Sequence, residues 1–140
     1  MAAGDDGVDH PNASVLLDRP FDLGTLSAAR RAVHGSFPLD ELSEKRAQGF
    51  VAAINEGMIN AIQHGGGRGN VRLVRTDGRL IAVVEDIRPS TPFVLPRELP
   101  SPTAEGGRGL WIIARCCDAA RVESGRTGLR VVMELALHPS

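Results

Sequence analysis

The spacing of apolar positions in the first half of the chain predicts one strand and two helices. Residues 14–18 (SVLLD) are an apolar run typical of a short strand, and Asp22 is suited to cap a helix over residues 23–36. A longer helix is predicted over residues 40–64, and a run of three glycines ends it. Four of its apolar residues fall on one stripe at helical spacing: Val51, Ile54, Met58 and Ile62.

The next segments alternate between β-branched runs and turn residues, as antiparallel strands do. Residues 70–75 and 80–86 are two such runs, and Asp77 and Gly78 between them are a strong hairpin signal. Residues 87–105 hold five of the nine prolines and are too long for a simple connector. We therefore expect a functional loop here, and a lid over a ligand is the expected role of residues 89–103.

The last part of the chain is predicted to form a helix and a second hairpin. The helix covers residues 110–117, and the strands cover residues 119–124 and 129–137. Helices that come in a group before antiparallel strands predict an α/β (α+β) two-layer sandwich, with helices on one face of a mixed, mostly antiparallel sheet. We expect one domain over residues 14–140, preceded by a disordered tail, residues 1–13, that has no periodicity.

Composition and charge exclude several classes of protein. The 140 residues are 42% hydrophobic and 24% charged, and the net charge of −1 gives no bulk attraction to nucleic acid or to a membrane surface. No apolar run approaches the ~20 residues that span a bilayer, and the N-terminus lacks the features of a signal peptide. These observations predict a cytoplasmic protein that acts through other proteins and binds no nucleic acid directly.

Three polar residues on the long predicted helix are spaced four apart and therefore share one face: Glu56, Asn60 and His64. The residues that flank this row are small: Gly49, Ala53 and Gly57. An asparagine carboxamide offers a neutral oxygen to Mg²⁺ and a glutamate can accept a proton, so the row suits a metal-assisted phosphate site with room for a ligand. Periodicity alone leaves this interpretation and a plain solvated surface equally open.

Glycines before the next predicted helix indicate a second candidate site, in the run EGGRGLWIIA. Glycine brings backbone N–H groups against a ligand without side-chain obstruction, and phosphate is the natural guest of a helix N-terminus. One such interaction contributes only ~0.3 to 1 kcal/mol, so a phosphate site also needs Mg²⁺ and several N–H groups acting together. Taken alone, the run is more typical of a flexible loop before a core helix that Trp111 anchors.

A pair of acidic residues, Glu85 and Asp86, ends the apolar strand just before the proline-rich loop. A carboxylate in this position can accept a hydrogen bond from an adenine amino group, but acids at strand ends are as often simple turn formers. By itself the pair favours neither interpretation.

The three motifs, in this order, resemble the GHKL superfamily of ATP-binding domains. Residues 50–65 (FVAAINEGMINAIQHG) are similar to its N box, residues 83–93 (VVEDIRPSTPF) to its G1 box and residues 106–117 (GGRGLWIIARCC) to its G2 box. The short length and Asp118 after the last predicted helix most resemble the anti-sigma-factor serine/threonine kinases, and the likeness covers nearly the whole chain from Ser14. The resemblance implies the Bergerat (GHKL, histidine-kinase-like ATPase) fold.

The resemblance also implies a role for each motif. It makes Glu56 the general base, gives Mg²⁺ to Asn60 and lets Asp86 read the adenine amino group of ATP. The implied ATP-binding set is Asn60, His64, Asp86, Gly107, Arg108, Gly109 and Leu110.

One position departs from the family pattern. The family's G1 box has a glycine two residues after the aspartate, whereas this chain has Arg88, followed by Pro89. A side chain therefore stands where the backbone should pass close to adenine, and this departure opposes nucleotide binding.

The leading hypothesis is an ATP- and Mg²⁺-dependent kinase that phosphorylates a serine or threonine of an anti-anti-sigma (antagonist) protein. It would otherwise sequester a sigma factor in bacterial transcription control, and the resemblance also implies a homodimer. The alternative is a non-catalytic protein-binding module of the same fold that has lost ATP binding through Arg88 and Pro89. The catalytic part of a histidine kinase is less favoured, because no helical segment with a phospho-accepting histidine is recognised before the domain.

Overall fold

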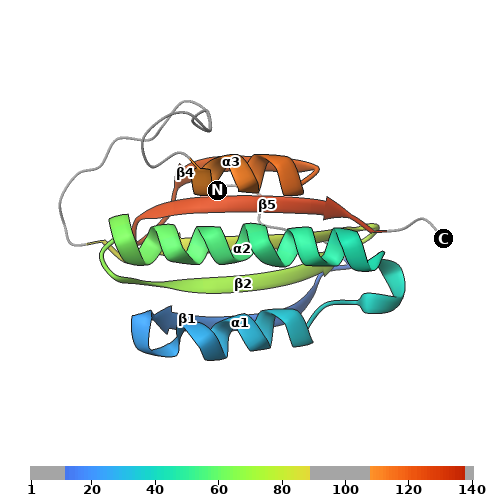
Figure 1. Cartoon of the computed structure of the whole chain (residues 1–140), viewed down its shortest axis with the longest axis horizontal. Helices are drawn as coiled ribbons and strands as arrows, with labels where there is room; N and C mark the ends of the chain where they lie inside the picture. The colour runs from blue at the N-terminus through green and yellow to red at the C-terminus, as the bar shows by residue number, and fades with distance from the viewer. Residues whose placement is uncertain (1–11, 89–107, 138–140) are drawn as a thin grey trace.

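The computed structural model describes residues 12–88 and 108–137 (Figure 1). Residues 1–11 of the predicted tail lie outside this part, as do residues 89–105 of the predicted loop, with its expected lid, and Gly107. None of the helices in the two described ranges combines the length and the apolar character that a membrane crossing requires.

The helices and strands follow one another in the predicted order, with small shifts at their ends. In chain order they are β1 (Ser14–Asp22), the 3₁₀ turn η1 (Leu23–Thr25), α1 (Leu26–Gly35), the 3₁₀ turn η2 (Leu39–Glu41), α2 (Glu44–His64), β2 (Arg68–Thr76), β3 (Arg79–Asp86), α3 (Arg108–Cys116), β4 (Ala119–Ser124) and β5 (Leu129–Ala136). Within the described residues, the five strands form one sheet in the order β1-β2-β3-β5-β4, and every neighbouring pair is antiparallel. Figure 1 shows α1, α2 and α3 on the same face of this sheet, which confirms the predicted two-layer sandwich.

Side-chain caps set where the helical segments begin. Asp22 and Thr25 form a reciprocal capping box, in which each side chain accepts a hydrogen bond at 2.9 Å from the backbone N–H of the other. Ser43 caps α2 by accepting a hydrogen bond from the Arg46 N–H at 3.2 Å. The long helix therefore begins at Glu44, later than predicted, and η2 occupies the residues before it.

Helix α2 lies over the middle of the sheet and packs on it through both small and large residues (Figure 1). Its buried residues are Ala47, Phe50, Ala53, Ile54, Gly57, Met58 and Ala61. Gly57 permits a close approach, since a Cβ there would stand 3.4 Å from a methyl group of Val84 on β3. Ala53, which helical spacing placed beside the polar row, is fully buried and borders no open face, whereas Val51 and Ile62 are half-buried at the core margin.

Helix α3 packs beside α2 in the opposite direction (Figure 1). A Cβ at Gly49, near the start of α2, would stand 3.5 Å from the Cys116 Sγ at the end of α3, so a glycine lets the two helices approach closely. Ile113 is fully buried and anchors α3 in the core. Trp111, which the sequence predicted to be the anchor, is instead 36% exposed, and Arg115 lies over its ring with Cζ 5.2 Å from the centroid.

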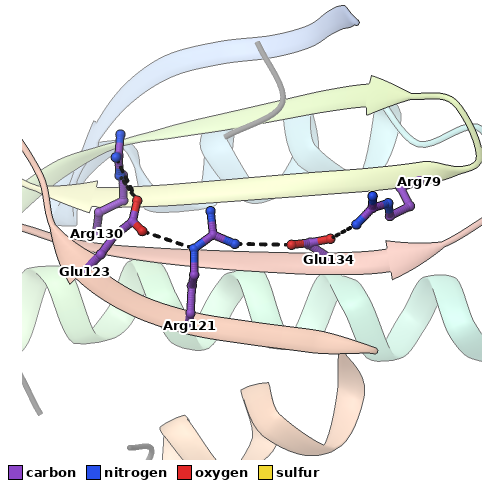
Figure 2. Close-up of polar contacts among 5 residues, drawn as sticks. All are labelled: Arg79, Arg121, Glu123, Arg130 and Glu134. Atoms are coloured by element: carbon purple, nitrogen blue, oxygen red, sulfur yellow. Dashed lines mark hydrogen bonds and ion pairs between the residues drawn. The ribbon is translucent and has the colours of Figure 1, made fainter. Parts of the chain in front are cut away.

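The face of the sheet opposite the helices carries a chain of ion pairs across β3, β5 and β4 (Figure 2). Glu134 on β5 accepts hydrogen bonds from Arg79 at 2.5 Å and from Arg121 at 3.2 Å. Glu123 on β4 accepts from Arg121 at 3.0 Å and from Arg130 at 2.9 Å. A small cluster of buried aliphatic residues belongs to the same face: Ile81, Val83 and Val132. Long charged side chains can cover such apolar surface with their aliphatic stems, and no helix in the described ranges covers this face.

Candidate functional site

A pocket of about 220 Å³ opens between the C-terminal half of α2 and the adjoining ends of β3 and β5. Its lining residues are Gly57, Asn60, Ala61 and His64 of α2, Val84, Asp86 and Arg88 at or just after the end of β3, and Leu129 and Val131 of β5. Small and aliphatic groups form most of the wall, and the polar groups converge from two directions. The fold therefore brings two of the predicted motifs, the polar row and the acidic strand end, to one cavity.

The polar row on α2 contributes two of its three members to the pocket. Asn60 is half-buried and His64 is exposed, and both line the cavity, whereas Glu56 lies one turn earlier on the same helical face and does not line it. Within the described part of the chain, none of the three side chains forms a hydrogen bond or an ion pair. Their polar atoms are therefore available to a ligand.

Asp86 is the buried polar group of the pocket, with only 4% of its surface exposed. Its Oδ1 accepts a hydrogen bond from the Leu129 N–H at 2.8 Å. The Nε–H of Arg88 is shared between the two carboxylate oxygens, with Nε 3.0 Å from Oδ1 and 3.1 Å from Oδ2. A buried carboxylate needs such donors, because leaving it unpaired would cost several kcal/mol, roughly 3 to 5.

Two glycines hold the Asp86 carboxylate in place from opposite sides. A Cβ at Gly65, just after α2, would stand 2.2 Å from Oδ2, and a Cβ at Gly128, just before β5, would stand 1.9 Å from Oδ1. Real Cβ atoms do not approach oxygen so closely, so any other residue at either position would displace the carboxylate. The sequence interpretation treated Gly65 as part of a helix stop and as the end of the segment similar to the N box, and it did not single out Gly128.

Arg88, which takes the place of a glycine in the G1 box of the GHKL family, lines the pocket. Its backbone N–H donates to the Thr127 carbonyl oxygen at 3.0 Å, and its side chain turns back onto Asp86. The side chain of Arg88 is 22% exposed and lines the pocket together with the carboxylate that it contacts. The side chain at this position thus forms a salt bridge with Asp86 inside the candidate site.

The turn between β4 and β5 is fastened to the end of β3 by contacts that the sequence did not reveal. Glu85 Oε2 accepts a hydrogen bond from the Thr127 N–H at 2.8 Å, and Thr127 Oγ1 lies 2.8 Å from both Glu85 Oε2 and the Asp86 carbonyl oxygen. Glu85 thus has a structural role beside Asp86. The sequence analysis predicted a hairpin here but gave Thr127 no role.

The beginning of α3 is the third predicted motif, and the structure describes its backbone from Arg108 onward. The contact of Gly49 with Cys116 and the opposite directions of the helices fix how α3 lies along α2. With the same rise of about 1.5 Å per residue in both helices, α3 begins beside Gly57 of α2, and Asn60 lies about one turn beyond that point. Contacts of Arg108, Gly109 and Leu110 with phosphate stay predictions.

Asp118 connects secondary structures and does not line the pocket. Its Oδ2 accepts hydrogen bonds from Arg46 Nη2 at 2.7 Å and from the Ala136 N–H at 2.6 Å, and so joins α2 to the end of β5. The hydrogen bond from Arg46, followed by that from Ala136, lowers the pKa of the Asp118 carboxyl.

The model of the histidine kinase-like ATPase domain family matches residues 20–135. The chain belongs to this family. This family is of the GHKL type that the three sequence motifs resembled, so the predicted fold is confirmed. No curated protein matches the chain at a significant level.

Two solved structures share this fold with the chain at low sequence identity. One contains the RsbU and RsbW domains of Rv1364c from Mycobacterium tuberculosis, with 20% identity, a TM-score of 0.60, and coverage of 86% of this chain and 31% of that one. The other is the SiaB–SiaC complex from Pseudomonas aeruginosa, with 15% identity, a TM-score of 0.61, and coverage of 86% and 89%. The present chain thus spans less than a third of the Mycobacterium tuberculosis protein chain.

Proposed function

We propose that this domain is an ATP- and Mg²⁺-dependent serine/threonine protein kinase that acts as an anti-sigma factor. The observation that carries the proposal is the meeting of Asn60, His64 and Asp86 in one pocket. Membership of the histidine kinase-like ATPase family supports nucleotide binding. The fold shared with structures that contain an RsbW domain and a SiaB–SiaC complex supports the kind of protein partner.

The residues present suit a nucleotide, although the described pocket would hold only part of one. A volume of about 220 Å³ is smaller than most small-molecule sites, which have volumes of roughly 300 to 1,000 Å³. Its small and aliphatic walls suit a purine base, while Asn60 and His64 offer polar atoms from α2. The unpaired N–H groups in the first turn of a helix such as α3 suit the phosphates.

Mg²⁺ would be held by Asn60 together with phosphate oxygens. In residues 12–88 and 108–137, no three His, Cys, Asp or Glu side chains gather into a metal site. The chemistry of Mg²⁺ allows such a sparse protein contribution, since the ion keeps several waters and usually takes one or two protein ligands beside the phosphates. When bound, ATP would supply the phosphoryl group and Mg²⁺ would neutralise charge on its phosphates, and the protein would bind and orient them.

Glu56 would accept the proton of the substrate hydroxyl group. It lies one helical turn before Asn60 on the same face, outside the pocket that would hold the nucleotide. This position suits a base that acts on a hydroxyl brought by a second protein. A positioned general base contributes ~10² to 10⁴-fold to the rate.

The partners in this proposal are an anti-anti-sigma protein, which is phosphorylated, and a sigma factor, which is bound when the antagonist has left. Phosphorylation adds a charge of about −1.5 to −2 to the antagonist, so a nearby acidic surface would repel it. A homodimer is part of the proposal through the family resemblance.

A second candidate function has one observation in its favour. The salt bridge between Arg88 and Asp86 already occupies the carboxylate that would read the base. A domain in which this contact excludes nucleotide would be a non-catalytic protein-binding module of the same fold.

Two substitutions on α2 test the kinase proposal, with Gln63→Ala as the control because Gln63 is exposed on the same helix and does not line the pocket. Calorimetry measures ATP binding in the presence of Mg²⁺, and transfer of labelled phosphate to a panel of antagonist proteins measures activity. We expect Glu56→Ala to bind ATP as the wild type does but to transfer phosphate ~10² to 10⁴-fold more slowly. We expect Asn60→Ala to weaken both binding and transfer.

The outcomes separate the two functions. Absence of binding heat for the wild type at millimolar ATP would favour the protein-binding module. Unchanged phosphate transfer in Glu56→Ala would remove this residue from the mechanism.

A further inference from the structure

The contact between Arg88 and Asp86 has a consequence for which nucleotide the pocket accepts. We infer that Arg88 supplies the hydrogen bond that an adenine amino group would otherwise donate to Asp86, so that this pocket does not select adenine over guanine. The inference rests on the proposed function, in which the pocket holds a purine base, and it concerns the specificity of that site.

The hydrogen-bonding capacity of Asp86 is largely taken up within the protein. An ionised carboxylate only accepts hydrogen bonds, and an amino group on a base can be read only by such an acceptor. Oδ1 already accepts from the Leu129 N–H at 2.8 Å, and both oxygens share the Nε–H of Arg88 at 3.0 and 3.1 Å. A donor from the pocket side is thus already in place.

The surroundings of the carboxylate leave little room for a second donor. Gly65 and Gly128 press against the two oxygens so closely that even a methyl group would not fit on either side. Asp86 is 4% exposed and Arg88, which contacts it, lines the pocket. Asp86 and Arg88 both line the pocket, so the guanidinium group lies beside the carboxylate on the pocket wall and competes with a ligand for its oxygens.

The backbone of Arg88 is fixed, so the arginine cannot leave by a small shift of the chain. Its N–H donates to the Thr127 carbonyl oxygen at 3.0 Å, and the Thr127 hydroxyl lies 2.8 Å from the Asp86 carbonyl oxygen. On the other side, a Cβ at Gly66 would stand 2.2 Å from the Ile87 carbonyl oxygen, so the chain before Arg88 is also tightly packed. Only rotation of the Arg88 side chain could uncover Asp86, and that would break a charge-assisted hydrogen bond.

The group that the pocket presents in place of the carboxylate has the opposite hydrogen-bonding character. A guanidinium has only donors, whereas a carboxylate has only acceptors. Adenine carries an amino donor at the six-position, and guanine carries a carbonyl acceptor there. The 6-amino group therefore gains no hydrogen bond from the buried carboxylate, and a 6-oxo group meets no repulsion from it.

Binding measurements on the wild-type protein test the inference without any substitution. Dissociation constants of ATP, GTP and inosine triphosphate are measured with Mg²⁺ by calorimetry, or by competition against a fluorescent nucleotide. We expect the three constants to lie within about threefold of one another, because the difference that one hydrogen bond to a charged group makes, about 10- to 100-fold, is absent. A wild-type preference for ATP of about tenfold or more over both 6-oxopurine nucleotides would overturn the inference.

Substitution of Arg88 is a second test of the inference on nucleotide selectivity. Arg88→Gly and Arg88→Met both remove the guanidinium, and Arg126→Met is the matched control, since Arg126 is exposed in the β4–β5 turn and does not line this pocket. We expect both Arg88 variants, but not the control, to acquire a preference for ATP over GTP of about 10- to 100-fold. Circular dichroism checks that each variant is folded, and if the buried Asp86 prevents folding, the wild-type comparison decides alone.

The remaining outcomes distinguish this inference from the proposed function. If the wild type binds no nucleotide and Arg88→Gly binds ATP, Arg88 is a plug and the inference on selectivity is wrong, although the pocket is a nucleotide site. If neither the wild type nor a folded Arg88 variant binds any nucleotide, the proposed function fails and the inference fails with it. If the Arg88 variants bind ATP and GTP equally well, Asp86 does not read the base, which also contradicts the inference.

Discussion

Met133 and Glu134 are neighbours on β5, but they belong to opposite faces of the sheet. Met133 is fully buried under the helices, in the same core cluster as Ile54 and Met58 of α2. Glu134 lies on the open face, where it joins Arg79 and Arg121 in the chain of ion pairs (Figure 2). The period-two alternation of a strand thus assigns adjacent residues to two different environments.

The two faces of the sheet differ in how rigidly they hold a polar group. On the open face the arginine partners of Glu134 are 59% and 38% exposed, so water can replace an ion pair that is lost. On the helix-covered face Asp86 sits at the end of an apolar layer, between two glycines, and water cannot replace its partners. A precise binding site is therefore expected on the covered face, and a tolerant surface on the other.

The largest expected difference in the free energy of unfolding is between substitutions at two adjacent positions, one on each face of the sheet. Met133→Ala removes a fully buried side chain and should lower the free energy of unfolding by about 2 to 5 kcal/mol, through lost burial and the cavity left behind. Glu134→Ala should cost less than about 1 kcal/mol, because the exposed arginines regain water. Urea denaturation of both variants measures the difference, and equal losses would contradict the assignment of the faces.

A smaller effect is expected from adding a single methyl group at the pocket. Gly128→Ala would place its Cβ 1.9 Å from Asp86 Oδ1 and 2.7 Å from the Asp86 carbonyl oxygen. Relieving this overlap should lower the free energy of unfolding by about 1 to 3 kcal/mol. Gly35→Ala is the control, since a Cβ at Gly35 meets nothing within 4 Å. A Gly128→Ala protein as stable as this control in thermal denaturation would show that the carboxylate is not held as described.

The smallest effect concerns the ion pair between Arg46 and Asp118, which lies outside the core. The side chains of Arg46 and Asp118 are 40% and 44% exposed. Asp118→Asn should cost only about 0.5 kcal/mol at neutral pH, because both side chains of the pair are exposed to water. Because folding lowers the pKa of Asp118, its contribution is present above the unfolded pKa and is lost as the pH falls through the folded value. The difference in stability between wild type and variant should therefore shrink below a pH of about 4. A difference that stays constant with pH would exclude the charge as its cause.

Much of the secondary structure could be predicted because local signals and the final packing agree. The β2–β3 hairpin follows from two β-branched runs and a turn in which Gly78 adopts a φ of 71°, a conformation that glycine reaches without strain. The start of α2 was predicted at residue 40, which is too early, because Ser43 is the residue that caps the helix. Acidic residues before Ser43 are also typical of a helix start. Trp111 was misplaced because residue size does not reveal which side of a short helix faces the core.

The site was predictable only as separate pieces. Helical spacing aligned Asn60 with His64, and its position at the end of a strand made Asp86 a candidate. No local sequence pattern indicates that these three groups share a cavity. Glu56 belongs to the same helical row and yet does not line the pocket, since a row along a helix is longer than the cavity beside it.

The amino-acid sequence alone indicated the order of the elements, the apolar stripe of the long helix and the polar groups available for chemistry. These depend on periodicity, turn residues and caps, which act over a few residues. The position of Arg88 on Asp86, and the enclosure of that carboxylate by Gly65 and Gly128, were decided only by tertiary structure. The end of α2, the end of β3 and the start of β5 are far apart in the chain, and close packing alone determines which atoms meet there.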